Sequence, residues 1–319
     1  MSAALVLKVD VDTYRGTLEG VPRLLDLFAK EGVRATFLFS LGPDNTGKAV
    51  KRVLKKGFVK KVLSASPAAS YGFATMLYGT LLPAPDIGAK PDAVRRMREV
   101  KAAGHECGIH GWDHVDWHDR LPAMSREEIA ATFARAAARF EKVFGMRACT
   151  AGAPGWTANA LSVEAYESNG IKVSSDSRGG GPFHPLRPDG TASKVLEIPT
   201  TLPTLDELLA LPLPGAGSQV EKACEILRMR KREGEEKATD AATDLVDVHS
   251  IHTEIEGGPA FCGSFARLLS GWKSDGVRVL TFEELCRTLR STGTSPVRRL
   301  TYTMIPGRAT PVATGGEGA

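Results

Sequence analysis

The chain has 319 residues, of which 42% are hydrophobic and 24% charged, the composition of a soluble globular protein with one large or two ordinary domains. Its formal net charge of +4 is modest and gives no indication of nucleic-acid binding. No uninterrupted apolar run reaches about 18 residues, so no membrane-spanning helix is predicted.

Cysteine usage and the start of the chain indicate a cytoplasmic protein. The five cysteines are scattered and include no Cys-x-x-Cys pair, which favours reduced thiols over a disulfide framework. Residues 4–11 already have the pattern of a buried strand, so we expect no signal peptide before the fold.

The first predicted strand ends in two acids. Residues 5–12 are mostly apolar and finish with Asp10 and Asp12, whose spacing of two puts both side chains on one face of a strand. A helix at 20–31 and a strand at 34–39 complete a βαβ unit. The two acids are therefore candidates for chemistry at the carboxyl end of a parallel sheet, although acids of a turn or helix cap would look the same.

The next segment changes abruptly in charge. Residues 48–61 contain seven basic residues and no acid, and residues 62–85 contain no charge but several aromatic and aliphatic side chains. Such a pair of stretches is typical of a segment that lies on an anionic membrane surface. The alternative is a solvated basic helix followed by a buried excursion.

Residues 104–120 hold four of the seven histidines of the chain, which indicates a metal or acid/base site, although a single histidine is more often a surface or core residue. Both His110/His114 and His114/His118 have the His-x-x-x-His spacing, which can place two rings on one cation. A strand is predicted at 105–109, and His110 lies at its end. We therefore favour His110 with His114 and expect supporting or structural roles for His105 and His118.

Strands and helices continue to alternate after this stretch. Ser125 and Glu128 form a capping box at the start of a helix. A late strand ends at His252 and is followed by Glu254, whereas His249 has the opposite parity to His252 and is predicted to be structural. The further predicted elements are helices at 91–103, 125–144, 158–169, 261–273 and 281–290, strands at 146–151, 171–174, 195–198, 245–252 and 277–280, and a solvated charged segment at 228–240.

The acids and histidines at three strand ends can meet on one face of a parallel barrel. Two histidines and one carboxylate are three metal ligands, which leaves positions open for water and substrate, as in a catalytic site. The remaining aspartate could accept a proton from water and the remaining histidine could donate one to a leaving group. The pattern indicates hydrolysis.

At these residues the sequence resembles the NodB-homology polysaccharide deacetylase superfamily. The resemblance implies an α/β fold, a distorted (β/α)7 barrel, and one divalent metal ion of the Zn, Mn or Co class. By position, Asp10 resembles the base of that family, His252 its acid, and Asp176 the residue on the loop that orients the acid. The implied metal ligands are Asp12, His110 and His114.

The stretches VDVDTYRGTLEGVPRLL, FSLGPDN, YGTLLPAPDIG, GIHGWDH, AGAPGW, SDSRG and IHTEIEGG, in this order, narrow the resemblance to a deformylase branch of the superfamily. This branch removes formate from undecaprenyl phosphate 4-deoxy-4-formamido-L-arabinose, for lipid A modification and polymyxin resistance. It implies a peripheral protein on the cytoplasmic face of the inner membrane, bound to an anionic membrane surface and not to nucleic acid. The alternatives are a glycan N-deacetylase of the superfamily and a non-catalytic metal- or membrane-binding protein.

Two departures from the family pattern concern the histidine motif and the partner of the base. Gly111 stands where Ser or Thr is usual, and AGAPGW lacks the arginine that generally pairs with the base. Arg15 or Arg178 could take that place. The expected substrate-binding residues are Arg15, Trp156, Arg178 and Glu254. The expected organisation is one domain over 1–291, with a membrane-facing insertion at about 48–90, and a flexible tail over 292–319.

Overall fold

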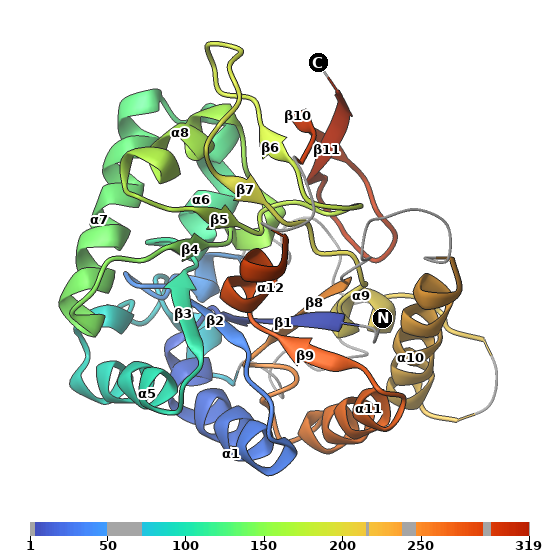
Figure 1. Cartoon of the computed structure of the whole chain (residues 1–319). Helices are drawn as coiled ribbons and strands as arrows, with labels where there is room; N and C mark the ends of the chain where they lie inside the picture. The colour runs from blue at the N-terminus through green and yellow to red at the C-terminus, as the bar shows by residue number, and fades with distance from the viewer. Residues whose placement is uncertain (1–3, 50–71, 215–216, 238–246, 290–294, 319) are drawn as a thin grey trace.

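A curled parallel sheet with helices around its outside forms the body of the protein (Figure 1). The structure is a computed structural model, and it describes residues 4–49, 72–214, 217–237, 247–289 and 295–318. All statements below refer to these residues.

The main sheet draws its strands from the whole length of the chain. In the described residues it has eight strands: β1 (Ala4–Val11), β2 (Thr36–Phe39), β3 (Glu106–Ile109), β4 (Thr150–Ala151), β5 (Val173–Ser174), β7 (Leu196–Glu197), β8 (Asp247–His252) and β9 (Arg278–Leu280). Their order is β7-β5-β4-β3-β2-β1-β8, with β9 also paired to β1, and these pairs are parallel. The predicted strands at 146–151 and 171–174 shorten to the two-residue β4 and β5.

The two outer strands of this order approach each other. The backbone amides of Thr201 and Leu202, just beyond β7, both donate to the carbonyl of Val248 on β8, at 3.1 Å each. These bonds bring the sheet edges together, as a barrel requires. The predicted distorted (β/α)7 barrel is confirmed.

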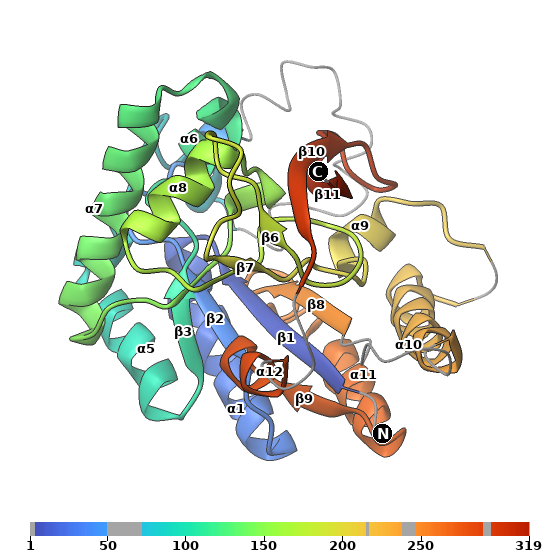
Figure 2. The ribbon, with the colours of Figure 1, turned by 45° about the horizontal axis from the view of Figure 1, so that its top comes forward.

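Helices follow most strands and cover the outer face of the sheet (Figure 2). The α-helices are α1 (Val21–Glu31), α5 (Pro91–Ala102), α6 (His114–Arg120), α7 (Arg126–Phe144), α8 (Ala160–Ser168), α9 (Leu205–Leu209), α10 (Gln219–Lys237), α11 (Cys262–Ser274) and α12 (Phe282–Leu289). A π-helix, η1 (Gly16–Gly20), precedes α1, and short 3-10 turns are η2 (Thr75–Leu77), η3 (Ile87–Ala89), η4 (Leu121–Ala123) and η5 (Pro154–Trp156). The six helices predicted by range are present, and the capping box of Ser125 and Glu128 is confirmed. Helices α6 and α9 were not predicted.

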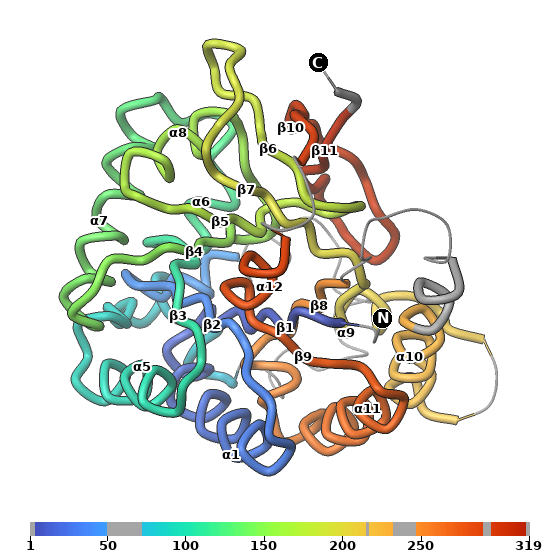
Figure 3. The backbone as a smooth tube through the Cα atoms, viewed as in Figure 1, coloured from blue at the N-terminus to red at the C-terminus, as the bar shows by residue number. Residues whose placement is uncertain are grey.

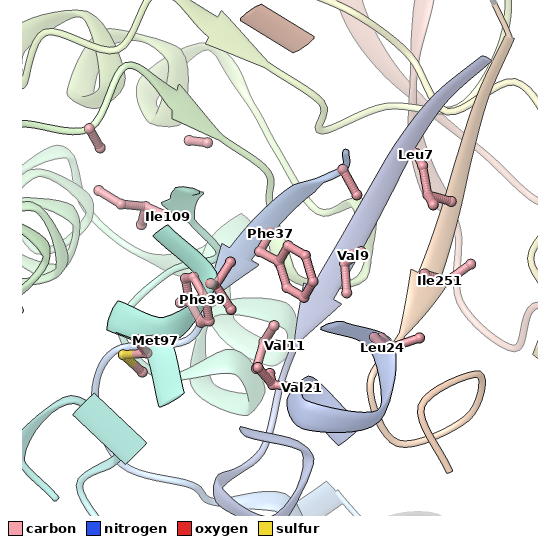
Figure 4. Packing of buried hydrophobic residues seen from close by; sticks show 14 of the residues in the cluster. Leu7, Val9, Val11, Val21, Leu24, Phe37, Phe39, Met97, Ile109 and Ile251 are labelled. Carbon is pink, nitrogen blue, oxygen red and sulfur yellow. The ribbon is translucent and has the colours of Figure 1, made fainter. Parts of the chain in front are cut away.

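The two faces of β1 have different surroundings, because side chains alternate along a strand. Leu7, Val9 and Val11 pack in the large outer core between the sheet and its helices, beside residues of β2 and β8 (Figure 4). Lys8 and Asp10 lie on the opposite face, which is the inside of the barrel, and both are buried. Fully burying an aliphatic side chain contributes roughly 1.5–3 kcal/mol, so the apolar face holds β1 while the polar face is left for chemistry.

The predicted flexible tail is wrong for residues 297–318. β10 (Val297–Thr303) and β11 (Val312–Gly318) pair antiparallel, and β10 also pairs with β6 (His184–Pro185), as the path of the chain shows in Figure 3. Val312 and Ala313 are buried, and the hydroxyl of Tyr302 donates to the carbonyl of Ala158 at 2.9 Å. These contacts outweigh a Thr- and Gly-rich composition that predicts fraying.

Most of the basic run predicted to face a membrane lies outside the described residues, which resume at 72. In the part of the chain that the structure describes, no helix is both long and apolar enough to cross a membrane. In the described residues, which include all five cysteines, no disulfide is formed. The boundary of the main domain at 291 stays a prediction.

Candidate active site and metal centre

A cavity of about 180 Å³ lies at the carboxyl ends of β1, β3 and β8. Asp10 and Asp12 come from the end of β1, His110 and His114 from the turn after β3 and the start of α6, and His252 from the end of β8. The parallel sheet therefore brings together five predicted site residues from distant parts of the chain, as strand ends of a barrel do.

The turn after β3 sets the positions of the two histidines. Gly111 has φ of +107°, a conformation that residues with a Cβ rarely adopt, which accounts for glycine in place of the usual Ser or Thr. Asp113 then caps α6 by accepting hydrogen bonds from the amides of Val115 and Asp116, at 3.1 and 3.0 Å. His114 is the first residue of α6 and turns back toward His110, with 5.3 Å between ring centroids.

Asp12, His110 and His114 form a cluster that can hold a metal ion. One ligand atom from each lies within 4.8 Å of the others. Nε2 of His110 is 3.2 Å from Oδ1 of Asp12, and Nε2 of His114 is 3.6 Å from Oδ2. The structure brings His110 and His114 together at this cluster, which is the pair favoured from the sequence over His114 and His118.

The protonation states of this cluster also suit a metal. Burial opposes the charge on Asp12, but the neighbouring rings of His114 and His110 outweigh it and keep the pKa of that carboxyl below its usual range. Burial lowers the pKa of His114, which favours the neutral imidazole. Oδ1 of Asp12 is buried and accepts no hydrogen bond, so its lone pairs are available to a cation. Carboxylate and neutral imidazole are the ligand forms that divalent metals bind.

One carboxylate oxygen of Asp10 faces this cluster, and the other contacts Lys8. Its Oδ2 accepts a hydrogen bond from the hydroxyl of Ser250 at 2.8 Å and lies 3.5 Å from Nζ of Lys8. Its Oδ1 has no hydrogen-bond partner and lies 3.7 Å from Nδ1 of His110. The expected arginine partner of Asp10 is thus replaced by Lys8, which is two residues earlier on the same face of β1.

His252 is paired with Asp206, at the second position of α9. Nδ1 of His252 lies 3.6 Å from Oδ1 of Asp206. Burial would lower the pKa of His252, but the carboxylates of Asp206 and Asp12 outweigh it and raise the pKa to about 9. An imidazolium stabilised in this way can donate a proton.

The resemblance places Asp176 on the loop that orients the acid, but the carboxylate that pairs with His252 is that of Asp206. Oδ1 of Asp176 instead accepts a hydrogen bond from the amide of Ala153 at 2.6 Å, and burial, with the nearby carboxylate of Glu197, raises its pKa well above the usual range. Asp176 therefore fixes the loop that leads to Trp156.

This fold and this set of residues match a known family over more than half of the chain. Residues 6–174 match the polysaccharide deacetylase family. The chain belongs to the polysaccharide deacetylase family. It is accordingly a hydrolase of the type that acts on amides.

Three similar proteins extend the match beyond residue 174. A relative from Shewanella sediminis, named a probable 4-deoxy-4-formamido-L-arabinose-phosphoundecaprenol deformylase ArnD, is 33% identical over 254 residues, which cover 79% of this chain and 75% of the relative. A relative of the same name from Wigglesworthia glossinidia brevipalpis is 28% identical over 298 residues, which cover 92% of this chain and 96% of the relative. The solved structure of a probable polysaccharide deacetylase from Pseudomonas aeruginosa PAO1 has a TM-score of 0.60 at 18% identity, with 91% of each chain covered, and shares the fold.

In this polysaccharide deacetylase Trp156 lines the cavity, as expected of a substrate-binding residue. Its backbone has φ of +53°, and its indole nitrogen donates to the hydroxyl of Thr200 at 3.1 Å. A non-glycine residue in the left-handed region is uncommon and is often found at functional sites. The strained turn of η5 presents the ring to the cavity.

The other three predicted substrate-binding residues lie outside the cavity lining. Arg178 is buried behind Trp156, Glu254 accepts hydrogen bonds from the amide and hydroxyl of Thr13 at 3.0 and 2.6 Å, and Arg15 pairs with Glu19 at 3.1 Å. Their contact with substrate stays a prediction.

The remaining histidines divide as the sequence predicts, with one difference. His105 is buried between Phe28 and Phe37, and burial lowers its pKa to about 4. His249 is also buried and packs on Trp272, which confirms structural roles for both. His118 lines the same cavity as Asp12, His110 and His114, so it lies at the site and not in the core.

Sequence reasoning missed Lys8, Asp206 and Arg308 in this polysaccharide deacetylase. Strand parity could have found Lys8, because it shares its face of β1 with Asp10 and Asp12. Asp206 and Arg308 follow no motif and belong to segments with no predicted element, so only the folded chain reveals that they line the cavity.

Proposed function

We propose that this protein is a metal-dependent deformylase that removes formate from undecaprenyl phosphate 4-deoxy-4-formamido-L-arabinose. The product would be the 4-amino sugar lipid used in lipid A modification and polymyxin resistance. The observation that carries the proposal is the convergence of Asp10, Asp12, His110, His114 and His252 on one cavity, in a chain whose long matches are to deformylases of that name.

The choice of a deformylase over a glycan N-deacetylase rests on the long matches to relatives named as deformylases. The cavity formed by the described residues measures about 180 Å³, which suits the amide-bearing end of a substrate of either kind.

The proposed metal ligands are Asp12, His110 and His114. A divalent ion of the Zn, Mn or Co class bound there would polarise the formamide oxygen and make a water molecule more acidic. The cluster fits such an ion because its three ligand atoms converge and Oδ1 of Asp12 lacks a hydrogen-bond donor.

Two other residues of the chain move the protons. Asp10 accepts the proton of the attacking water at Oδ1, because Ser250 and Lys8 hold Oδ2. His252, kept protonated by Asp206, donates a proton to the sugar nitrogen as the bond between that nitrogen and the formyl carbon breaks. The amide and one water thus become formate and an amine.

The lipid substrate requires access to a membrane surface, and we propose a peripheral position on the cytoplasmic face of the inner membrane. Phe73 and Leu81 are 73% and 81% exposed, which is unusual for large apolar side chains so close together. Their segment is tied to the cavity rim, since the amide of Gly47 donates to the carbonyl of Tyr78 at 3.0 Å and Ala49 lines the cavity.

Vesicle flotation tests the membrane contact. Replacing Phe73 and Leu81 by serine should reduce binding to anionic vesicles severalfold, because two apolar side chains that would be buried in the bilayer are removed. Met229→Ser, which changes an exposed apolar residue on α10, is the matched control and should bind as the wild type does. Equal binding of all three proteins would remove this surface from the proposal.

Formate release tests the function itself. The metal-loaded protein is incubated with the formamido sugar lipid and, in parallel, with the acetamido analogue. Faster release of formate than of acetate supports the deformylase. Preference for the acetamido compound would make it a deacetylase, and failure to cleave either would leave a non-catalytic metal- or membrane-binding protein.

A further inference from the structure

Two arginines, Arg178 and Arg308, stack on the indole ring of Trp156. They differ in the number of hydrogen bonds that their guanidinium groups donate. The guanidinium carbons of Arg178 and Arg308 lie 4.9 and 4.8 Å from the ring centroid. Arg178 uses three of its donors, because it donates to the carbonyls of Thr200 and Leu202 at 3.1 and 2.9 Å and to Glu207 at 2.6 Å.

Arg308 keeps most of its donors available. Among the described residues it makes one long hydrogen bond, from Nη2 to the carbonyl of Gly155 at 3.4 Å, a distant ion pair with Glu207 at 4.0 Å, and a longer-range electrostatic interaction with Asp206. A guanidinium has five N–H donors. Arg308 also lines the cavity, whereas Arg178 does not.

The backbone holds Arg308 at this place. Gly307 has φ of +85°, and a Cβ added there would meet the carbonyl oxygen of Glu207 at 2.3 Å, so the loop between β10 and β11 packs directly on α9. The amide of Arg308 closes a turn by donating to the carbonyl of Ile305 at 3.3 Å. The side chain is therefore presented by a fixed loop.

Charge within the cavity makes Arg308 distinctive. Among the described lining residues it is the sole lysine or arginine, and the acids Asp10, Asp12 and Asp206 line the same space. An anionic group would be repelled by these acids and attracted to the guanidinium. Arg308 and the metal cluster would thus hold opposite ends of a ligand that has an amide at one end and a negative charge at the other.

We infer that Arg308 binds the phosphodiester that links the sugar to its lipid, and so orients the formamide toward Asp10 and Asp12. The inference rests on the proposed function, whose substrate carries this phosphate. Arginine suits the task because its planar fork can donate two hydrogen bonds to one phosphate. Arg308 acts here as a binding residue.

Paired substrates test the inference. The neutral substrate is the methyl glycoside of 4-deoxy-4-formamido-L-arabinose, and the anionic substrate is the geranyl phosphodiester of the same sugar. We expect Arg308→Ala to reduce the ratio of kcat/KM for the anionic over the neutral substrate about 10- to 100-fold, the loss of one charge-assisted contact. Arg308→Lys should reduce it less, and Arg299→Ala, an exposed arginine on β10, should not change it.

The ratio of kcat/KM for the two substrates distinguishes a phosphate contact from a purely structural role of Arg308. If Arg308→Ala slows both substrates equally, the side chain only supports Trp156 and the inference fails. An unchanged rate on both substrates would overturn it as well.

A binding measurement keeps this test independent of hydrolysis. Calorimetric titration with geranyl phosphate should give a Kd at least tenfold weaker in Arg308→Ala than in the wild type or Arg299→Ala. That result would support Arg308 as the phosphate contact even if the wild type cleaves neither formamide, an outcome that would refute only the proposed function. Equal affinity for inorganic phosphate would assign the site to free phosphate and overturn the lipid-linked ligand.

Discussion

The active-site cavity has two walls that are built in different ways. The strand wall consists of Asp10, Asp12, His110, His114 and His252, at or just after strand ends of the barrel. The loop wall consists of Trp156, Asp206 and Arg308, from η5, α9 and the connection between β10 and β11. Backbone pairing in the sheet, together with the short turn after β3, positions the strand wall, whereas loop turns and side-chain pairs between distant segments position the loop wall. Chemistry common to a family is expected on the first and choice of substrate on the second.

The largest effect is expected on the strand wall, from Asp12→Asn. The amide is a poor metal ligand, so both the bound metal and turnover should be lost, with kcat/KM down about 10³-fold or more. Elemental analysis and formate release measure the two quantities. Asp10→Asn should keep the metal and still lose turnover. Full activity of Asp10→Asn would contradict its role as base.

Lys8→Met tests how the strand wall is supported. The ammonium beside Oδ2 of Asp10 would be replaced by an apolar chain of similar length, and we expect kcat to fall about 10- to 100-fold with metal content unchanged. Lys231→Met is the matched control, because Lys231 is equally buried but pairs with Asp247 at 3.1 Å. Similar losses in both variants would mean that kcat reports general stability instead of the position of Asp10.

Asp206→Asn tests the contribution of the loop wall to catalysis. Removing this carboxylate lowers the pKa of His252, whose protonated form is the active acid. If His252 is the acid, as proposed, activity is lost as pH rises through that pKa, so the alkaline limb of the pH–rate profile should move to lower pH, with kcat reduced about tenfold at pH 8. Asp176→Asn should leave the position of this limb unchanged. A shift in Asp176→Asn alone would reverse the assignment.

The smallest effect is expected on the free energy of unfolding, through the buried His105. The pKa of His105 is about 4 in the folded protein and about 6.5 when exposed, so the unfolded chain binds more protons below pH 6.5. Stability should therefore be complete above that pH and fall by on the order of 2 kcal/mol as pH drops to 4. Urea unfolding at pH 7 and 4.5 measures it. His105→Gln should reduce this dependence without abolishing it, because burial lowers the pKa of His249 to about 3 and gives a contribution of the same sign, whereas His184→Gln should preserve it.

The strand wall could be predicted from the sequence because its determinants are local. Asp10 and Asp12 end an apolar run, His110 ends another, and the parity of a strand decides which side chains share a face. The barrel then brings strand ends together regardless of their separation in the chain.

The loop wall could not be predicted, because its determinants are contacts between distant segments. Asp206 reaches His252 only after α9 forms, in a stretch without an apolar period long enough to predict a helix. Arg308 belongs to a segment whose Thr and Gly content indicates fraying, and its position depends on Gly307 packing on Glu207. The same limit explains why Asp176, rather than Asp206, was expected beside His252.

The central place of β1 has a consequence for the order in which the protein folds. β1 is synthesised before β8 and β9, yet it pairs with both, and Asp10 accepts its hydrogen bond from Ser250, which is 240 positions further along the chain. Domains tend to fold as units once their partners have been synthesised. In a nascent chain Asp10 would thus lack its hydrogen bond from Ser250 until β8 has been synthesised, so the cavity could be assembled only after that strand has emerged.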